Sequence, residues 1–279
     1  MTSLIWANIL ILGGIALTAA VVLYLTAQKF AVETSPLVDE VDSILPQANC
    51  GACGKAGCRN FAEACVAADA ETFKTLYCPV GGKPVMDKVA AVLSLTPAAK
   101  QPTVAVLRCN GSCQNAPVKY DYSGLRSCRI ASMVSVGETG CPDGCLRFGD
   151  CVQACRFDAL HIDPQTGIPV IDAAKCTSCG ACVKICPRGL FEIRPIAGNQ
   201  QVYVACRNRQ KGAAARKNCS AACIACQKCS KINPAVKIEN NLSYIPSDVS
   251  PQEYGTRLAE SCPTKAIVYK QAVLTENAE

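Results

Sequence analysis

Four cysteines follow one another closely in the chain, in the order Cys176-x₂-Cys179-x₂-Cys182-x₃-Cys186, and Pro187 comes directly after them. This is the bacterial ferredoxin spacing, in which three thiolates bind irons of one 4Fe-4S cube and the fourth binds the neighbouring cube. Structural zinc sites rarely string four cysteines so closely before a proline. The run therefore predicts a pair of 4Fe-4S clusters.

The composition excludes several other classes of protein. The chain contains 22 cysteines and one histidine in 279 residues, and half of its residues are hydrophobic. The hydrophobic fraction excludes a disordered tail, and the length excludes a small disulfide-bonded domain. A single histidine argues against zinc-finger chemistry. There is no G-x-G-x-x-G after a strand and no Walker A sequence, so we expect no nucleotide or flavin site.

The formal net charge of +6 counts every cysteine as neutral. A 4Fe-4S cube with four thiolates carries about −2 when oxidised, so four cubes would add about −8. The loaded chain would then carry about −2. The apparent basicity is therefore no argument for a nucleic-acid partner, and we expect none.

An uncharged run of 22 residues extends from Leu4 to Leu25, with Trp6 and Tyr24 near its ends. As a helix it would measure about 33 Å, enough to cross a hydrocarbon core of about 30 Å. A cleaved signal peptide is the alternative, but no Lys or Arg precedes the run, which is also longer than a usual signal-peptide core. We predict a transmembrane anchor over residues 1–27 that holds the chain in a lipid bilayer.

Composition divides the rest of the chain into three parts. We predict an N-terminal 4Fe-4S module over 28–96, starting with a helix at Ser35-Pro36 and ending with a second helix from Pro84 to Leu95. A proline-bounded linker follows at 97–102. The remainder is a second cysteine-rich region.

An internal repeat organises that second region. Four cysteines recur after 78 residues: Cys128, Cys141, Cys145 and Cys151 are followed by Cys206, Cys219, Cys223 and Cys229. Each copy then has two short strand-like pieces around a turn, at 160–162 and 169–171 in the first and at 236–238 and 242–245 in the second.

These features predict an α+β chain. A single N-terminal transmembrane helix and a small Fe-S module are followed by tandem ferredoxin-like β-α-β repeats. The first repeat, 103–200, should contain two 4Fe-4S sites, and the second, degenerate repeat, 201–279, should contain one.

Cluster ligands in the first repeat follow from the crossover rule, in which the last cysteine of a run binds the other cube. Phe148 stands where one ligand is expected, and Cys141 is the natural substitute. We therefore assign one cluster to Cys141, Cys145, Cys151 and Cys186. We assign its partner to Cys155, Cys176, Cys179 and Cys182.

The second repeat keeps one complete ligand set. Asn233 stands where the crossover cysteine is expected, and the later triplet is missing too. Under crossover, all the ligands of one cluster are lost together and all the ligands of the other remain. The remaining ligands are Cys223, Cys226, Cys229 and Cys262.

The N-terminal module offers a fourth ligand set. Its cysteines are Cys50, Cys53, Cys58 and Cys78. The glycines around the first two allow backbone N–H groups to approach cluster sulfurs and tune the potential. Cys65 lies four residues after Phe61 on an apolar helix face, and we favour a packed thiol over a ligand there.

Five further cysteines are candidates for additional ligands. Cys109 and Cys113 follow an apolar strand, Val104 to Leu107. Together with Cys128 and a fourth thiol from Cys141, Cys206 or Cys219, they could hold another cluster. The alternative is a set of free or loosely packed thiols. We expect at least four 4Fe-4S clusters, and five if this site forms.

Two other signals are weaker. A basic stretch from Arg207 to Lys217 could dock an acidic partner protein or could be a solvated loop. His161 fits a surface residue beside a turn better than a ligand. No Ser-His-Asp or paired-carboxylate arrangement stands out, so we expect no catalytic residue of the chain's own.

The combined pattern resembles the B subunits of Rnf complexes, the membrane-bound ferredoxin:NAD⁺ oxidoreductases that pump ions. The resemblance covers nearly the whole chain. It rests on the anchor, the NCGACG sequence from Asn49, the CPVGG sequence from Cys78, the RCNGSC sequence from Arg108, the GDC sequence from Gly149 and the Cys176 run.

That resemblance implies an electron conduit within a translocase complex. It implies a single-pass protein of the cell inner (cytoplasmic) membrane, with its cluster domains on the cytoplasmic side. It also implies that the chain accepts electrons from soluble ferredoxin and passes them to other integral and peripheral subunits, which hold the flavin and NAD sites. The missing cluster of the last repeat departs from the more cluster-rich members of this family.

Two other functions stay open from the residues alone. The first is a ferredoxin-like relay subunit of a membrane hydrogenase or formate enzyme. The second is a non-redox metal or disulfide scaffold at the cell surface. Ferredoxin-type clusters are assembled where thiols stay reduced. We therefore expect the cluster-binding part of the chain to face the cytoplasm.

Overall fold

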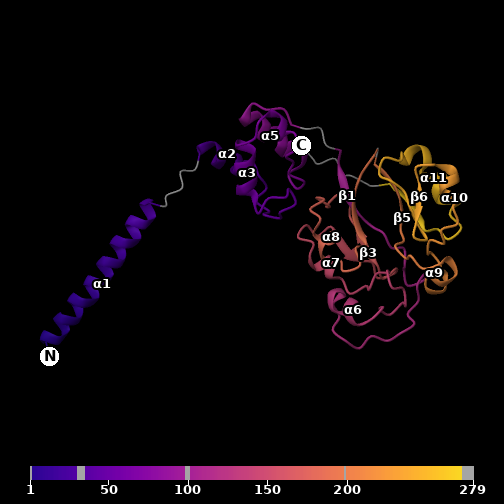
Figure 1. The fold of residues 1–279 in the computed structure, drawn as a ribbon, viewed down its shortest axis with the longest axis horizontal. Helices are drawn as coiled ribbons and strands as arrows, with labels where there is room; N and C mark the ends of the chain where they lie inside the picture. The colour runs from indigo at the N-terminus through magenta and orange to yellow at the C-terminus, as the bar shows by residue number, and fades with distance from the viewer. Residues whose placement is uncertain (1, 30–34, 98–100, 198, 272–279) are drawn as a thin grey trace.

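The computed structural model describes residues 2–29, 35–97, 101–197 and 199–271. The chain forms a single long helix, a small helical module and two units of short strands and helices (Figure 1). We call residues 103–196 the first unit and residues 200–271 the second unit. Half of the predicted linker at 97–102, namely residues 98–100, and the end of the predicted second repeat, 272–279, lie outside the described residues.

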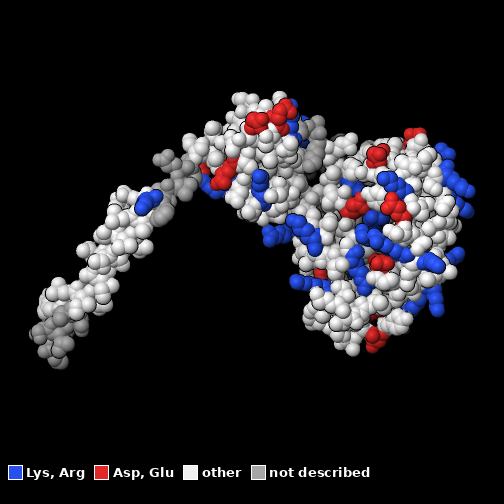
Figure 2. All heavy atoms as spheres, viewed as in Figure 1, with Lys and Arg blue, Asp and Glu red and all other residues white. Residues whose placement is uncertain are grey.

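The long helix α1 (Thr2–Lys29) extends beyond the predicted apolar run at both ends. Its 28 residues give a length of about 42 Å, more than the roughly 30 Å of a hydrocarbon core. The part from Leu10 to Lys29 has a mean hydropathy of 2.2, and Lys29 is its only charged residue (Figure 2). Among the described residues, α1 is the one helix long and apolar enough to cross a membrane.

Four helices form the N-terminal module, namely α2 (Pro36–Ile44), α3 (Cys58–Val66), α4 (Ala70–Phe73) and α5 (Gly82–Leu93). Pro36 occupies the first turn of α2, as the Ser35-Pro36 signal predicts. The helix predicted from Pro84 to Leu95 is α5, shifted two residues earlier, and Ser94 ends it in a left-handed conformation. Fully buried side chains from the four helices give the module its own core: Val41, Phe61, Phe73 and Val89.

The first unit begins and ends with strands that pair with each other. Its elements are β1 (Thr103–Leu107), α6 (Cys128–Val134), α7 (Asp150–Gln153), β2 (Leu160–Ile162), β3 (Pro169–Ile171), α8 (Ala181–Ile185) and β4 (Phe191–Pro195). Strands β1 and β4 are antiparallel, with Thr103 opposite Pro195 and Leu107 opposite Phe191. Strands β2 and β3 form the hairpin that the sequence predicts at the same residues.

The second unit repeats this order of strands and hairpin. Its elements are β5 (Gln200–Val204), α9 (Gly212–Asn218), α10 (Lys228–Ile232), β6 (Lys237–Glu239), β7 (Leu242–Tyr244), α11 (Pro251–Ser261) and β8 (Ile267–Gln271). Strands β5 and β8 are antiparallel, and β6 and β7 form a hairpin within one residue of the predicted pieces. The cysteine repeat is therefore accompanied by a repeat of topology.

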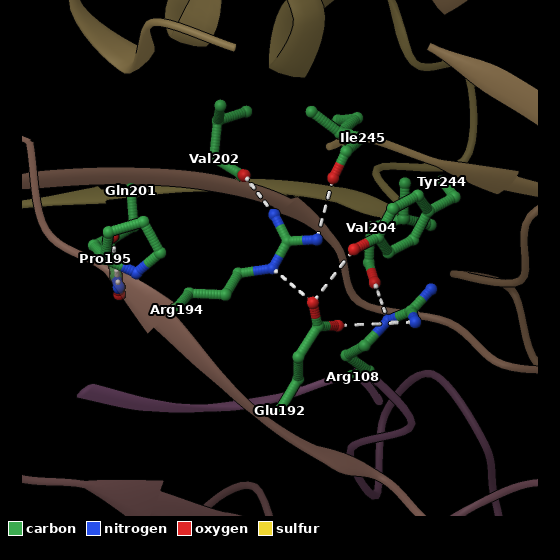
Figure 3. A network of polar contacts seen from close by, with 9 residues as sticks. All are labelled: Arg108, Glu192, Arg194, Pro195, Gln201, Val202, Val204, Tyr244 and Ile245. Carbon is green, nitrogen blue, oxygen red and sulfur yellow. Dashed lines mark hydrogen bonds and ion pairs between the residues drawn. The ribbon is translucent and has the colours of Figure 1, made fainter. Parts of the chain in front are cut away.

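A buried ionic network joins the two units (Figure 3). Arg194 of β4 is 3% exposed and donates hydrogen bonds to the carbonyl oxygens of Val202 (3.1 Å) and Ile245 (2.7 Å) in the second unit. Its Nε lies 3.2 Å from the Glu192 carboxylate. One guanidinium thus bonds both units at once.

A second guanidinium shares the same carboxylate. Arg108 lies 3.4 Å from Glu192 and donates to the carbonyl oxygen of Val204 at 3.4 Å. The Tyr244 hydroxyl donates to Glu192 at 3.1 Å, and both guanidinium groups lie over its ring. Removing one partner would leave a buried charge unpaired, which is strongly destabilising. The network therefore holds the two units in a fixed relative position.

Candidate metal centres

Cysteines line four hollows of similar size in the two units. Each of the four has a cavity volume of about 20 Å³. Zinc needs sulfurs that converge at about 2.3 Å from one point, whereas a 4Fe-4S cube needs thiolates set around a volume. Within the described ranges, no three His, Cys, Asp or Glu side chains converge as ligands of a single metal ion.

The hollow beside α8, which we call site 3, contains one predicted ligand set complete. Its cysteines are Cys155, Cys176, Cys179 and Cys182. The β2-β3 hairpin and strands β1 and β4 supply apolar walls, including Leu160, Ile171 and Ile193. Burial raises the pKa of the Cys182 thiol to about 12, and the charges of Cys176 and Cys179 act in the same direction. Cys176 and Cys179 therefore lie near enough to Cys182 to influence its charge.

The hollow beside α7, which we call site 2, differs from the predicted ligand set. Its cysteines are Cys128, Cys145, Cys151 and Cys186. The expected Cys141 lines a different hollow, and Cys128 stands in its place. The prediction took the nearest spare cysteine along the chain, whereas the fourth cysteine lining this hollow stands 17 residues before Cys145.

Phe148 and Asp150 explain how Cys128 reaches site 2. The Phe148 ring packs against Tyr122, with ring centroids 5.5 Å apart, which holds the segment that leads to Cys128. The Asp150 carboxylate then accepts hydrogen bonds from the N–H groups of Cys128 (2.9 Å) and Arg129 (3.1 Å). Burial acts to raise the pKa of Asp150, but these donors hold it below its usual value. The charged carboxylate thus ties the start of α6 to the start of α7.

The hollow beside α10, which we call site 4, contains the second repeat's predicted set. Its cysteines are Cys223, Cys226, Cys229 and Cys262. The Cys229 sulfur lies 3.2 Å from the Ser243 hydroxyl, and the Cys262 sulfur lies 3.7 Å from the Thr264 hydroxyl. Cys226 is exposed, so this site opens at the surface.

The fourth hollow lies between the two units, and we call it the seam hollow. Its cysteines are Cys109, Cys141, Cys145, Cys206 and Cys219. The sequence grouped Cys109 with Cys113 and Cys128, but only Cys109 of these three lines this hollow. Cys113 is exposed, and Cys128 belongs to site 2.

Site 1 lies in the N-terminal module, between the loop before α3 and the segment before α5. Its predicted ligands are Cys50, Cys53, Cys58 and Cys78. The Asn49 side chain accepts a hydrogen bond from the Cys58 N–H at 2.9 Å and closes the loop. The Cys78 sulfur accepts one from Gly81 N–H at 3.4 Å. Burial raises the pKa of Cys78, and the charges of Cys53 and Cys58 add to it, so these three thiols lie near one another.

Cys65 is buried in the core of the module, at 1% exposure. Burial raises the pKa of its thiol to about 12, with smaller contributions from Cys53 and Cys78. It packs with Phe61 and Phe73 as a small apolar side chain does.

Buried thiols in the two units share one electrostatic property. Burial raises the pKa of Cys151 and Cys206 to about 12 and that of Cys219 to about 11. Iron binds the thiolate, so cluster loading at these sites releases protons. Each hollow is lined by at least four thiols among mainly apolar neighbours, and this donor set fits a 4Fe-4S cluster.

Known protein families match two parts of the chain. Residues 45–73 match a family described as "Putative Fe-S cluster", and residues 139–190 match one described as "4Fe-4S dicluster domain". The first match covers part of site 1, and the second covers sites 2 and 3 except Cys128.

Curated relatives match almost the entire chain. The B subunit of the ion-translocating oxidoreductase complex of Methanosarcina acetivorans is 37% identical over 96% of this chain and 99% of its own length. The B subunit of the Na⁺-translocating ferredoxin:NAD⁺ oxidoreductase complex of Acetobacterium woodii is 38% identical over 92% of this chain and 75% of its own length. The proton-translocating counterpart of Clostridium ljungdahlii is 36% identical, over 91% and 88% respectively.

Proposed function

The chain belongs to the family of B subunits of ion-translocating ferredoxin:NAD⁺ oxidoreductase (Rnf) complexes, and on that premise we propose that it relays electrons from reduced ferredoxin to the other subunits. The observation that carries this proposal is the gathering of thiols around hollows of equal size in one chain. The coupling of that relay to ion movement belongs to the complex, since we expect no converting site in this chain itself.

The chain's own residues hold and shield the cofactors. Bound 4Fe-4S clusters would supply the one-electron chemistry. Four thiolates at each of sites 1 to 4 would fix a cluster in place, and the apolar walls would keep water away and so influence the potential. Backbone N–H groups directed at sulfur, as at Cys78, add a further influence on the potential.

Charge on the second unit supports docking of an acidic ferredoxin. Lys228, Lys231 and Lys237 are exposed on α10 and at the start of β6, and Lys228 lines the same hollow as the exposed Cys226 of site 4. Basic side chains also cover α9 in the same part of the molecule (Figure 2). A positive surface attracts an acidic partner and speeds its approach. We therefore assign the ferredoxin contact to site 4.

Location and domain organisation follow from the same arrangement. Helix α1 serves as a single anchor, and the N-terminal module and the two ferredoxin-like units lie on the cytoplasmic side, where thiols stay reduced. The proposed boundaries are 1–27 for the anchor, 28–96 for the module, 97–102 for the linker, and 103–200 and 201–279 for the units.

Anaerobic purification of the full-length membrane protein tests this proposal. We expect iron and acid-labile sulfide in equal amounts, reduction of the clusters by reduced ferredoxin, and co-purification with ferredoxin:NAD⁺ oxidoreductase activity. Co-purification with a hydrogenase or formate dehydrogenase would instead show that the chain relays electrons within that enzyme. Protein with zinc in place of iron and sulfide would overturn the electron-relay role itself.

A further inference from the structure

The seam hollow draws its thiols from both units. Cys109 follows β1 and Cys141 precedes α7 in the first unit, whereas Cys206 follows β5 and Cys219 follows α9 in the second. The remaining lining residues come from the same segments, including Ala116, Thr139 and Ala222. A group bound here would touch both halves of the chain.

The four thiols form two equivalent pairs under the repeat. Cys109 and Cys206 each stand two residues after the end of their unit's first strand. Cys141 and Cys219 each stand four residues before the thiol that opens the next site. Each unit thus contributes its own copy of the same two positions, and the seam hollow lies where the copies meet.

Backbone donors follow the same equivalence. Each of the four thiols accepts a hydrogen bond from the N–H two residues ahead of it, supplied by Gly111, Asp143, Asn208 and Ala221. The Cys145 N–H also donates to Cys109, and the corresponding Cys223 N–H donates to Cys206. N–H groups directed at sulfur are the usual surroundings of cluster thiolates. The repeat therefore preserves sulfur-binding geometry on both sides of the seam.

Two polar side chains at the seam are suited to an anionic occupant. Asn208 is 2% exposed and donates to the Cys141 sulfur at 3.4 Å across the unit boundary. Arg147 donates to the carbonyl oxygens of Gly111 and Ala116, while its buried Nε has no hydrogen-bond partner in the described residues. Its positive charge acts on the thiols of both units, at Cys109 and at Cys219.

Backbone hydrogen bonds hold the two sides of the hollow together. The Asn110 N–H donates to the Ala205 carbonyl at 2.9 Å, and the Ser220 N–H donates to the Asn115 carbonyl at 2.8 Å. The ionic network of Arg108, Glu192 and Arg194 fixes the strands next to it (Figure 3). The thiols are thus preorganised across the boundary.

We propose that Cys109, Cys141, Cys206 and Cys219 bind a fifth 4Fe-4S cluster, with two ligands from each unit. The proposal rests on the proposed function only in requiring that the chain be loaded with clusters. Cys145, the fifth thiol of the hollow, belongs to site 2. It stands six residues before Cys151, as Cys223 stands six before Cys229 in site 4.

A cluster at the seam would complete a line of four centres. Cys145 lines both the seam hollow and site 2, and Cys223 of site 4 donates its N–H to Cys206 of the seam. At the far end, Cys151 of site 2 interacts with Cys182 of site 3. The seam cluster therefore connects the surface-exposed site 4 to sites 2 and 3 of the first unit. Electrons would pass between the two units through this cluster.

Cluster counting on the anaerobically purified full-length protein tests this. The wild type should contain about 20 iron atoms per chain, and the double variant Cys206→Ser/Cys219→Ser about 16. The matched control Cys113→Ser, which changes an exposed thiol outside all four hollows, should keep about 20. A redox titration by EPR should show one signal lost in the double variant while the other signals remain.

A second measurement tests the proposal even when the double variant does not fold. Native mass spectrometry of the wild type counts clusters without any substitution, and five supports the seam cluster. A wild type with four clusters that ferredoxin still reduces overturns the seam cluster and leaves the proposed function standing. Five clusters that ferredoxin cannot reduce overturn the proposed function and leave the seam cluster standing.

Discussion

The two units share their topology, but only the first has a site 3. Cys155 of the first unit corresponds to Asn233 of the second, since they stand four residues after Cys151 and Cys229 respectively. The five-residue α8, which carries two thiols of sites 2 and 3 at or near its ends, corresponds to the eleven-residue α11. The second unit therefore has a longer helix where the first unit has the cysteine-lined hollow of site 3.

Side chains fill the space that the cluster would take. Ala105, the third residue of β1, becomes Val202 in β5, and Ile193, the third residue of β4, becomes Tyr269 in β8. Leu258 of α11 is fully buried in the resulting core. A Cβ at Gly255 would lie 2.4 Å from the Tyr269 ring, so this glycine is what lets helix and ring approach. If site 3 holds the proposed cluster, the same topology accepts an inorganic core in one unit and a hydrocarbon core in the other.

Removal of iron should produce the largest difference in stability between the two units. The first unit's buried core consists largely of residues around the cysteines of sites 2 and 3, whereas the second unit keeps an apolar core around Leu258. Because cluster binding supplies folding free energy, anaerobic chelation should unfold the first unit before the second. Amide hydrogen exchange should show loss of protection in β4 while α11 and β8 stay protected. Equal loss of amide protection in both units would contradict the idea that apolar side chains of the second unit take the place of a cluster.

Leu258→Ala should expose the second unit's dependence on its apolar core. Truncating a fully buried leucine costs about 2–5 kcal/mol. We expect that loss in the free energy of unfolding of the loaded protein, measured by denaturant titration under anaerobic conditions. The control Leu125→Ala removes a leucine that is 67% exposed in the first unit and should change stability by less than about 0.5 kcal/mol.

Charge-reversal variants should show which of the two units docks ferredoxin. Lys228→Glu/Lys231→Glu near site 4 should lower the second-order rate of reduction by an acidic ferredoxin about tenfold at low salt, with a weaker effect at high salt. The matched variant Lys175→Glu/Lys184→Glu places the same change near site 3 of the first unit. A larger effect of this second variant, measured by stopped-flow spectroscopy, would move the ferredoxin contact to the first unit.

Tyr244→Phe should weaken the connection between the units slightly. The change removes the hydroxyl that donates to Glu192 and keeps the ring beneath Arg108 and Arg194. One hydrogen bond to a charged group of this kind contributes about 1.5–3 kcal/mol. The unfolding free energy should fall by that amount while the iron content stays unchanged. The control Tyr120→Phe alters an exposed tyrosine in the first unit and should have no effect.

Alkylation should produce the smallest difference, confined to single thiols. Cys113 is exposed, so iodoacetamide should modify it in the loaded native protein at pH 8. Burial raises the pKa of Cys65 to about 12, so this thiol is neutral and shielded and should stay unmodified. Peptide mass mapping distinguishes the two, and modification of Cys65 in native protein would show that the N-terminal module opens.

Local sequence signals predicted much of the fold. Strands, hairpins and the helix that starts at Pro36 follow from proline, glycine and alternating apolar residues, and the structure has them within a few residues. The thiols of sites 3 and 4 also gather as spacing predicts, because each set includes a closely spaced triplet on one loop. Short-range geometry is enough in these cases.

Long-range contacts account for what spacing missed. Cys128 reaches site 2 through the Phe148–Tyr122 contact and the Asp150 carboxylate, which no periodicity in the sequence encodes. The seam hollow depends on how two units pack, and its pairs are offset by 97 residues for Cys109 and Cys206 but by 78 for Cys141 and Cys219. A comparison of strand ends in the two repeats would have revealed the first pair.

The position of the seam thiols along the chain sets an order in time during synthesis. The ligands of sites 1 to 3 are complete once residue 186 has been made, but the seam set is complete only at residue 219. At about 5–20 residues per second, the ribosome adds these 33 residues in roughly 2–7 s. During that interval β4 completes the first unit and the second unit begins, while Cys109 and Cys141 have no partner thiols from the second unit. If the seam thiols bind the proposed cluster, the biosynthetic machinery must keep these two thiols reduced and empty until Cys206 and Cys219 have been made.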